Sequence, residues 1–535
     1  MNVIGGANMS CSIKELLETY PKYKEKLFIR GYFVTNDNIT SISGFPFYSN
    51  WKEFNFGCYK FLVHKKQNIY FYGLNGKEVV LIGNCVNPFR LSYKEDEIVK
   101  ELFLLINEDI DDAINYINEL TGIFTLFYVN NETISFLSDP AGMLFCCYAN
   151  INDKLFISSH VQLIADLYKF EKDEYVKKLE NYKFFYKYGL FFPGDITQYN
   201  GIKRVLQNHI FKYRKNNVSF HRFYPSKDLS ICNNEEEYRN LIKKVVTILN
   251  NTMLCVSKKW SNPAISLTGG MDSKTTLAAT CGMYDNFSYY SYITMNGDIA
   301  DAEAARKISS HLNLKHEIYE ISENDSDFSD IDIVRTIIEH NNGGYRINCN
   351  DVRKRLFFSE NYPYDVEVKS WVSEIARANY YKKFGLNKMP HKLSPRNMTS
   401  MYKIFIYQRK LALLTDRVFE NFIKKSKFND IPEGYDASDM YLWEFRYSAW
   451  GGLAITSEHL YSYDIFIPYN NRLLLDLMLT APLEKRVSDE FHEDLIKYGN
   501  KIISETNITI TNWNETRSRM YLEKMYFLIN SILPF

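Results

Sequence analysis

Between residues 233 and 321 short apolar runs alternate with segments of helical pattern, and this alternation restricts the fold more than any other feature of the sequence. We expect strands over 262–267, 287–295 and 315–321, and helices over 233–256, 274–284 and 302–313. Asn233 or Asn234 is a plausible N-cap of the first helix. Strands and helices that alternate in this way form a parallel sheet with crossover helices, so the sequence predicts a doubly wound α/β domain.

A glycine pair lies on the turn between the first of these strands and the helix after it. Residues 265–276 read ISLTGGMDSKTT. The first amides of a helix lack partners and bind anions, and glycine lets the backbone approach a phosphate closely. A Walker loop would need a second glycine before Lys274, where Ser273 stands, and the Gly-x-Gly-x-x-Gly dinucleotide pattern is absent. A phosphate-binding turn is the favoured interpretation, and an ordinary strand-to-helix turn without a ligand is the alternative.

The first 225 residues favour strands instead. Short runs rich in β-branched and aromatic residues occupy 69–74, 78–83, 122–129, 133–138 and 154–159, and turn signals such as Asn75-Gly76 separate them. An all-β or α+β layered domain fits this pattern. The length of 535 residues is too great for one ordinary core, so we expect a domain over 1–225 and a second over 235–535, mostly helical beyond residue 330.

Charge and cysteine usage restrict the environment of the protein. The chain has 64 basic and 64 acidic side chains and no apolar run of about 18 residues, so neither nucleic acid nor a membrane is an expected partner. The 9 cysteines follow no paired-ligand spacing, and the first residues show no basic stretch followed by an apolar one. We therefore expect reduced thiols, no signal peptide and a cytoplasmic location.

The turn at 267–273, Leu-Thr-Gly-Gly-Met-Asp-Ser, resembles the pyrophosphate loop Ser-Gly-Gly-x-Asp-Ser of the ATP-pyrophosphatase (PP-loop) superfamily. The resemblance implies ATP and Mg²⁺ as cofactors, with Asp272 as a magnesium ligand. The residues it assigns to the nucleotide are Leu267, Thr268, Gly269, Gly270, Asp272, Ser273 and Thr294.

Further segments resemble asparagine synthetases and extend the likeness over roughly residues 70 to 500. They are LTGIFTLFYV (120–129), ISFLSDPAGMLFCCYA (134–149), KLFISSHVQLIADL (154–167), FFPGDITQYNGIKRVLQNHIF (191–211), DAEAARKISSHLNLKHEIYEI (301–321) and IPYNNRLLLDLMLTAPLEKR (467–486). β-Lactam synthetases and lasso-peptide cyclases are related to this family. The resemblance implies an N-terminal Ntn-like αββα sandwich of the class II glutamine amidotransferase type, and a C-terminal doubly wound PP-loop synthetase domain with a helical extension.

The N-terminal half departs from the family at its nucleophile. Glutamine-hydrolysing members expose a cysteine directly after the initiator methionine, whereas Asn2 follows Met1 here and Cys11 is the nearest thiol. A degenerate amidotransferase domain without glutaminase activity is therefore expected. Asp139, which would help to hold glutamine in the family, is interpreted as a remnant of the fold.

The C-terminal half departs from the family in its second loop, which reads KSWVSEIAR over 369–377. Glu374 is the acidic residue that survives, and Ser373 replaces the second magnesium acid. Glu374 or Asp365 could supply a carboxylate to the metal or to proton transfer, and Arg377 could neutralise phosphate charge. The alternative is that Glu374 is a solvated or capping residue.

Relatives that close lactam rings use a tyrosine–glutamate pair as base, and Tyr345 is the tyrosine candidate beside Glu374. A tyrosine needs a partner to act as a base near neutral pH. The late lysine that stabilises the oxyanion in the family has no match, and Lys524, Arg517 and Arg519 are substitutes between which the sequence does not choose.

Four further charged positions have structural interpretations. Asp301 and Glu303 open a predicted helix, where acids favour the helix dipole. Arg446 and Arg472 are interpreted as salt-bridge formers at the edge of the core.

The function that these residues imply is ATP-dependent amide formation: a carboxylate is adenylated, pyrophosphate is released, and an amine takes the acyl group. The expected partners are a small-molecule or peptide carboxylate and an amine donor, which is ammonia or a substrate amine. A homodimer or a partner protein of the same pathway stays open. The alternatives are an asparagine synthetase and a non-catalytic nucleotide-binding paralogue.

Overall fold

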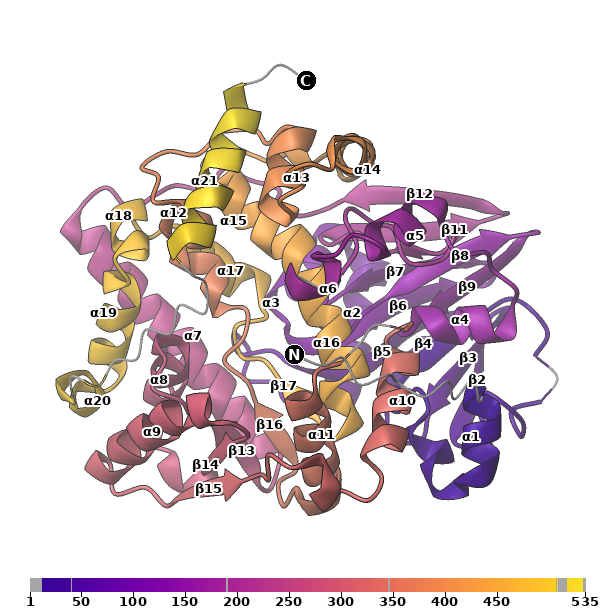
Figure 1. Cartoon of the computed structure of the whole chain (residues 1–535), viewed down its shortest axis with the longest axis horizontal. Helices are drawn as coiled ribbons and strands as arrows, with labels where there is room; N and C mark the ends of the chain where they lie inside the picture. The colour runs from indigo at the N-terminus through magenta and orange to yellow at the C-terminus, as the bar shows by residue number, and fades with distance from the viewer. Residues whose placement is uncertain are drawn as a thin grey trace.

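The computed structural model describes residues 12–39, 41–188, 191–344, 347–506, 508 and 517–532 (Figure 1). Four residues named above, Met1, Asn2, Cys11 and Tyr345, lie outside these ranges. No helix in the described ranges is long and apolar enough to cross a membrane.

Two antiparallel sheets make up the N-terminal half. The first has the strand order β10-β8-β9-β1-β3-β2 and the second the order β12-β11-β7-β6-β5-β4. The strands of the first sheet are β1 (Tyr32–Thr35), β2 (Trp51–Phe56), β3 (Tyr59–His64), β8 (Cys147–Ile151), β9 (Lys154–Ser158) and β10 (Lys203–Arg204). Those of the second are β4 (Ile69–Leu74), β5 (Lys77–Val86), β6 (Thr121–Asn130), β7 (Thr133–Ser138), β11 (His209–Arg214) and β12 (Asn217–Arg222).

The two sheets face each other, and helices cover their outer sides. The rings of Phe61 on β3 and Phe127 on β6 lie 5.2 Å apart in the core between the sheets. Helix α2 (Glu95–Glu108) packs on β4 and β5 and on α3 (Ile110–Glu119), while α4 (Val161–Leu167) packs on β9 of the other sheet. The predicted αββα sandwich is therefore confirmed.

The C-terminal half is built around a parallel sheet with the order β15-β14-β13-β16-β17. Its strands are β13 (Pro263–Ser266), β14 (Ser288–Ile293), β15 (His316–Glu320), β16 (Val366–Val368) and β17 (Ile465–Phe466). The predicted doubly wound α/β fold is confirmed. The chain first builds the sheet outward from β13 on one side and then returns to its other side with β16, so the topological switch point lies between these two strands. Open α/β sheets bind ligands at the carboxyl ends of the strands at such a point.

Helices flank this sheet and extend it on one side (Figure 1). Helix α7 (Glu235–Lys259) is capped by Asn234, whose side chain accepts from the Glu237 amide. The helices that follow are α8 (Met271–Ala278), α9 (Ile299–His311), α10 (Ile331–Asn341), α11 (Cys349–Asn361), α12 (Asn379–Phe384), α13 (Pro395–Tyr402), α14 (Arg409–Ser426), α15 (Ala437–Tyr441), α16 (Gly452–Ser457), α17 (Arg472–Leu479), α18 (Leu483–Val487), α19 (Glu490–Gly499), α20 (Lys501–Glu505) and α21 (Arg517–Ile532). Short helices α1 (Ile13–Thr19), α5 (Glu174–Glu180) and α6 (Phe185–Tyr188) belong to the N-terminal half, and a π-helix η7 (Leu442–Gly451) joins α15 to α16.

The segment that follows β17 joins the two halves through buried polar groups. The Asn470 side chain accepts from the Ala141 amide at 2.9 Å and donates to the Gly122 carbonyl at 2.7 Å. The fully buried Arg472 donates to the Asn208 side chain at 2.9 Å and to a backbone carbonyl, so its predicted role in a core-edge salt bridge is wrong. Because such buried groups are costly without partners, this segment fixes the position of one half against the other.

Candidate functional site

The glycine turn lies at the carboxyl end of β13, directly before α8. Gly270 caps α8 without a side-chain hydrogen bond, so the cap leaves the first amides of this helix available to an anion. The Thr268 amide donates to the Ser273 hydroxyl at 3.0 Å, and the Gly269 amide donates to Asp301 at 3.2 Å. The sequence predicted only a favourable interaction of Asp301 with the helix dipole. In the structure its carboxylate also accepts a hydrogen bond from one amide of the turn.

Leu267 and Thr294, two of the residues assigned to the nucleotide from the sequence, lie on neighbouring strand ends. Leu267 is buried after β13, and its amide donates to the Tyr290 carbonyl of β14 at 2.8 Å. Thr294 follows β14, and its amide and hydroxyl both donate to Asp298, at 2.8 and 2.7 Å. The Thr294 hydroxyl therefore already donates within the protein. A nucleotide could pack against this position but would not receive a hydrogen bond from its hydroxyl group.

Asp272 points across the switch point to the loop that follows β16. The Ser373 hydroxyl donates to one of its carboxylate oxygens and the Arg377 guanidinium donates to the other, at 2.6 Å, in both cases from the short 3₁₀ helix η5 (Ser373–Arg377). Arg377 also donates to Asp489 at 2.8 Å. The structure therefore brings together two loops that lie about 100 residues apart in the chain.

Glu374 is the reactive candidate of this second loop. Its Oε2 atom is buried and has no hydrogen-bond partner within the described part of the chain. Burial and, second, the nearby Asp272 carboxylate raise the pKa of Glu374 to about 8, against the opposing effect of Arg377 and Arg446. A carboxyl group with these properties can exchange a proton near neutral pH or accept a cation, so the interpretation as a solvated residue is not favoured.

The backbone of the second loop is strained on both sides of these groups. Val372 has φ of 81° and Ala378 has φ of 47°. A β-branched residue in the left-handed region costs on the order of 1–3 kcal/mol, and such strain is typical of functional loops. This conformation turns Ser373 and Glu374 toward α8.

The carboxylates at this site suit Mg²⁺ only if the phosphate oxygens of a bound nucleotide supply further ligands. The described residues contain no group of three or more histidine, cysteine, aspartate or glutamate side chains placed to hold a metal ion. Mg²⁺ in nucleotide sites is bound by one or two carboxylates together with phosphate oxygens. Asp272, with the unpartnered Oε2 of Glu374 near it, meets that requirement, and these are the two residues that would hold the ion.

Other residues named from the sequence lie elsewhere. Asp365 accepts from the Asn262 amide at the amino end of β16, opposite the site, so its role as the alternative carboxylate is wrong. Lys524 donates to the Gly385 carbonyl, and Arg519 pairs with Glu523 within α21. Arg517 begins α21 and is exposed.

Sequence reasoning missed the residues that α19 contributes. Asp489 at its start bonds Arg377 and Lys382, and the fully buried His492 lies 3.9 Å from the Asp272 carboxylate. Burial lowers the pKa of His492 to about 4, so the ring is neutral. No motif marks these positions, because their relation to Asp272 depends on how α19 packs against α8.

Asp139 of the N-terminal half has a structural role that agrees with its interpretation as a remnant. Its fully buried carboxylate accepts from the Met143 and Leu144 amides at 2.9 and 2.8 Å and from the Asn470 side chain at 2.7 Å. These bonds hold the turn after β7 against the other half, and they leave the carboxylate no exposed surface for a ligand.

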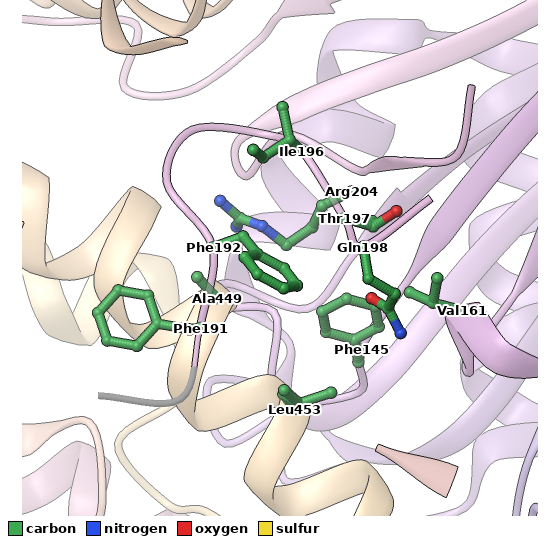
Figure 2. A pocket seen from close by; sticks show the side chains of 10 residues that line it. All are labelled: Phe145, Val161, Phe191, Phe192, Ile196, Thr197, Gln198, Arg204, Ala449 and Leu453. Atoms are coloured by element: carbon green, nitrogen blue, oxygen red, sulfur yellow. The ribbon is translucent and has the colours of Figure 1, made fainter. Parts of the chain in front are cut away.

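One cavity lies between the two halves, away from the phosphate turn. Figure 2 shows the rings of Phe145, Phe191 and Phe192 around it, with Leu453 below and the Arg204 side chain above. It contains about 300 Å³ of empty space, part of it open to solvent. Its lining is mainly apolar, and the Arg204 guanidinium is held by Ser448 and the Gly194 carbonyl, so the cavity presents no acid–base pair.

No protein-family model and no curated protein matches the sequence. Solved structures that overlap with the chain include the glutamine phosphoribosylpyrophosphate amidotransferase of B. subtilis in complex with ADP and GMP. That overlap has 11% identity and a TM-score of 0.23, and it covers 57% of this chain and 62% of that one. A glutamine-dependent NAD⁺ synthetase from Acinetobacter baumannii in complex with ADP overlaps at 13% identity and a TM-score of 0.17, over 36% of this chain and 39% of that one. At these values the site is interpreted from its own geometry.

Proposed function

We propose that the protein is an ATP-dependent, AMP-forming ligase that activates a carboxylate and transfers the acyl group to an amine. The observation that carries the proposal is the pairing of the glycine turn and Asp272 with Glu374 and Arg377 at the switch point of a parallel sheet. The resemblance of residues 267–273 to the pyrophosphate loop, and of the wider chain to asparagine synthetases, supports the same reaction.

Each group has a role in this reaction. The first amides of α8 and the Arg377 guanidinium would neutralise the phosphates, and Asp272 with Glu374 would hold the magnesium ion of MgATP. Bound ATP would supply an electrophilic α-phosphorus: the substrate carboxylate would bond to it as pyrophosphate leaves, and the carboxylate would then carry AMP, a good leaving group when the amine attacks. The protein then has to align the substrate carboxylate and to receive a proton from the attacking amine. The raised pKa of Glu374 suits this role as the alternative to holding the ion.

Isotope exchange tests the first half of the reaction. With MgATP and a panel of carboxylic acids that includes aspartate, the purified full chain should catalyse exchange of labelled pyrophosphate into ATP, dependent on one of the acids. AMP rather than ADP should accumulate when an amine is added. Formation of ADP, or binding of ATP without exchange for any acid, would contradict the proposal.

The proposed reaction differs from that of a glutamine-dependent synthetase in the source of the amine. We expect ammonium or a substrate amine, but not glutamine, to support product formation, and no release of glutamate from glutamine. Burial raises the pKa of Cys85 and Cys147 well above the ordinary value and that of Cys146 to about 12, so these thiols do not form the nucleophilic thiolate. Glutamate release that a thiol-alkylating glutamine analogue abolishes would contradict this expectation.

A second candidate function is nucleotide binding without turnover. Two contacts favour it, because Asp301 already occupies an amide of the phosphate turn and Arg377 already neutralises Asp272. Under this candidate ATP would bind, yet no carboxylic acid would give pyrophosphate exchange.

A further inference from the structure

An apolar groove lies on the outer face of the second antiparallel sheet, in the N-terminal half. Helix α3 and the end of α2 form one wall, and strands β6, β7 and β11 form the floor and the other side. The groove is open to solvent and has a volume of about 250 Å³. Among the described residues that line it, only Tyr128 and Ser135 carry a polar side-chain group, so its surface is almost entirely apolar.

Solvent reaches the strands on the far side of the groove. Helix α2 packs on β4 and β5, whereas Ser219 and His221 of β12 and Lys212 of β11, on the same outer face, are all exposed. In the wall of the groove Ile110, the first residue of α3, is 58% exposed. A contiguous apolar surface that stays open to solvent in this way is typical of an interaction site.

The size and lining of the groove favour protein side chains over a small molecule as its occupant. Small-ligand pockets usually have about 300–1,000 Å³ and a few converging polar groups that orient the ligand. This groove is smaller, and its described lining offers two hydroxyl groups and no charged side chain. Apolar side chains of a protein partner need only shape and apolar contact, and the groove supplies both.

Carboxylates border the groove on the side of the helices. Glu108, Asp109, Asp111 and Asp112 surround Ile110 at the junction of α2 and α3, and all four are exposed. Asp109 caps α3 by accepting from two backbone amides of its first turn. None of the four carboxylates forms an ion pair with a cation within the described part of the chain. The edge of the groove at α3 is therefore negative.

Cations border the opposite edge of the groove. Lys212 of β11 pairs with the groove-lining Ser135 of β7, so both residues lie on the same face of the sheet. Arg214 follows two residues later on that face, and both cations are exposed. Neither forms an ion pair with a carboxylate in the described ranges. The apolar groove thus has a negative edge at α3 and a positive edge at β11.

We propose that a second copy of this chain docks on this groove, in a symmetric dimer whose two-fold axis runs along it. Such an axis places the α3 edge of each copy against the β11 edge of the other, so opposite charges face each other twice. It also lays α3 of each copy over the open strands of the other, where Ile110 gains apolar contact. A partner or membrane surface of a single charge sign would meet one edge of like charge.

Sedimentation equilibrium of the full chain tests the proposal, over concentrations up to about 100 µM, which saturate an interface with a dissociation constant on the order of 1 µM. We expect the mass to rise with concentration to twice that of one chain. Ile110→Glu places a charge in the apolar surface and should weaken the association about tenfold or more. The matched control is Leu104→Glu on α2, a residue that is 45% exposed and lies outside the groove lining, and it should leave the association unchanged.

Charge reversal tests the orientation of the two copies. Asp111→Lys and Lys212→Glu should each weaken the association about tenfold or more, because like charges would then face each other across the interface. A chain that carries both substitutions again presents opposite charges at the two edges, so its association should recover to within about threefold of wild type. Loss of folding cannot produce such a recovery, and circular dichroism of each variant checks the fold.

The proposal concerns a face outside the reaction site, so it stands or fails independently of the ligase function. Dimers that Ile110→Glu weakens and that the double reversal restores support it. A mass of one chain at every concentration overturns it, as do dimers that Ile110→Glu and the single reversals leave unchanged. Weakening by both single reversals without recovery in the double variant overturns the two-fold arrangement along the groove.

Discussion

Replacing Asp272 by asparagine is expected to reduce carboxylate-dependent pyrophosphate exchange by about 10³-fold, the largest effect of any single change that we predict. The substitution keeps the size of the side chain but removes the charge that faces Arg377 at 2.6 Å and that would hold magnesium against the triphosphate. Initial rates of isotope exchange at saturating ATP, together with the dissociation constant for MgATP, measure the effect.

Asp365→Asn is the matched control for this prediction. Asp365 belongs to the same sheet but lies at its amino end, where it accepts from the Asn262 amide. The pyrophosphate exchange rate of Asp365→Asn should stay within about twofold of wild type, because the candidate nucleotide site is at the opposite end of the strands. Exchange in Asp272→Asn equal to that of the control would show that the glycine turn is not the nucleotide site.

Replacing Glu374 by glutamine is expected to slow the complete ligase reaction about 10²-fold and to remove a pH dependence. In the wild type, burial and the Asp272 carboxylate raise the pKa of Glu374 to about 8. A base acts in its deprotonated form, so kcat/KM for the amine should rise with pH and level off above about pH 8. The glutamine variant carries no titrating group at this position, and its profile should lose this rise.

Steady-state rates between pH 6 and pH 9.5 test this prediction, with the exposed Glu360→Gln as control. If Glu374 acts on the metal instead, the variant should show a weaker affinity for MgATP with a pyrophosphate exchange rate that recovers at high Mg²⁺. An unchanged rate and an unchanged pH profile would show that Glu374 takes no part in the transfer step, and would favour nucleotide binding without turnover.

The raised pKa of Glu374 also has a consequence for stability. The folded-state pKa lies above the ordinary value, so the folded protein binds a proton that the unfolded chain releases between about pH 4.5 and pH 8. The contribution of this group to the free energy of unfolding is therefore fully present below pH 4.5 and is lost as the pH rises to 8. Magnesium bound at this site should reverse the loss, since it replaces the proton.

Most of the regular structure could be predicted because it depends on local patterns. The strands at 69–74 and 133–138 coincide with β4 and β7, and Asn234 caps α7 as expected. Strands β16 and β17 were not predicted, because they contain 3 and 2 residues and are too short for any periodicity. Their pairing comes from the sheet around them.

The sequence by itself determined the parallel sheet, the glycine turn and the presence of an acid at position 272, because short-range patterns and a seven-residue motif are enough to specify a strand, a turn and a helix start. Only the tertiary structure decided what surrounds that acid. Ser373 and Arg377 reach Asp272 from about 100 residues away, His492 and Asp489 come from a segment more than 200 residues later, and Arg446 of η7 lies close enough to Glu374 to lower its pKa. Desolvation and the field of neighbouring charges set the pKa of Glu374, and both depend on distances that no local pattern contains.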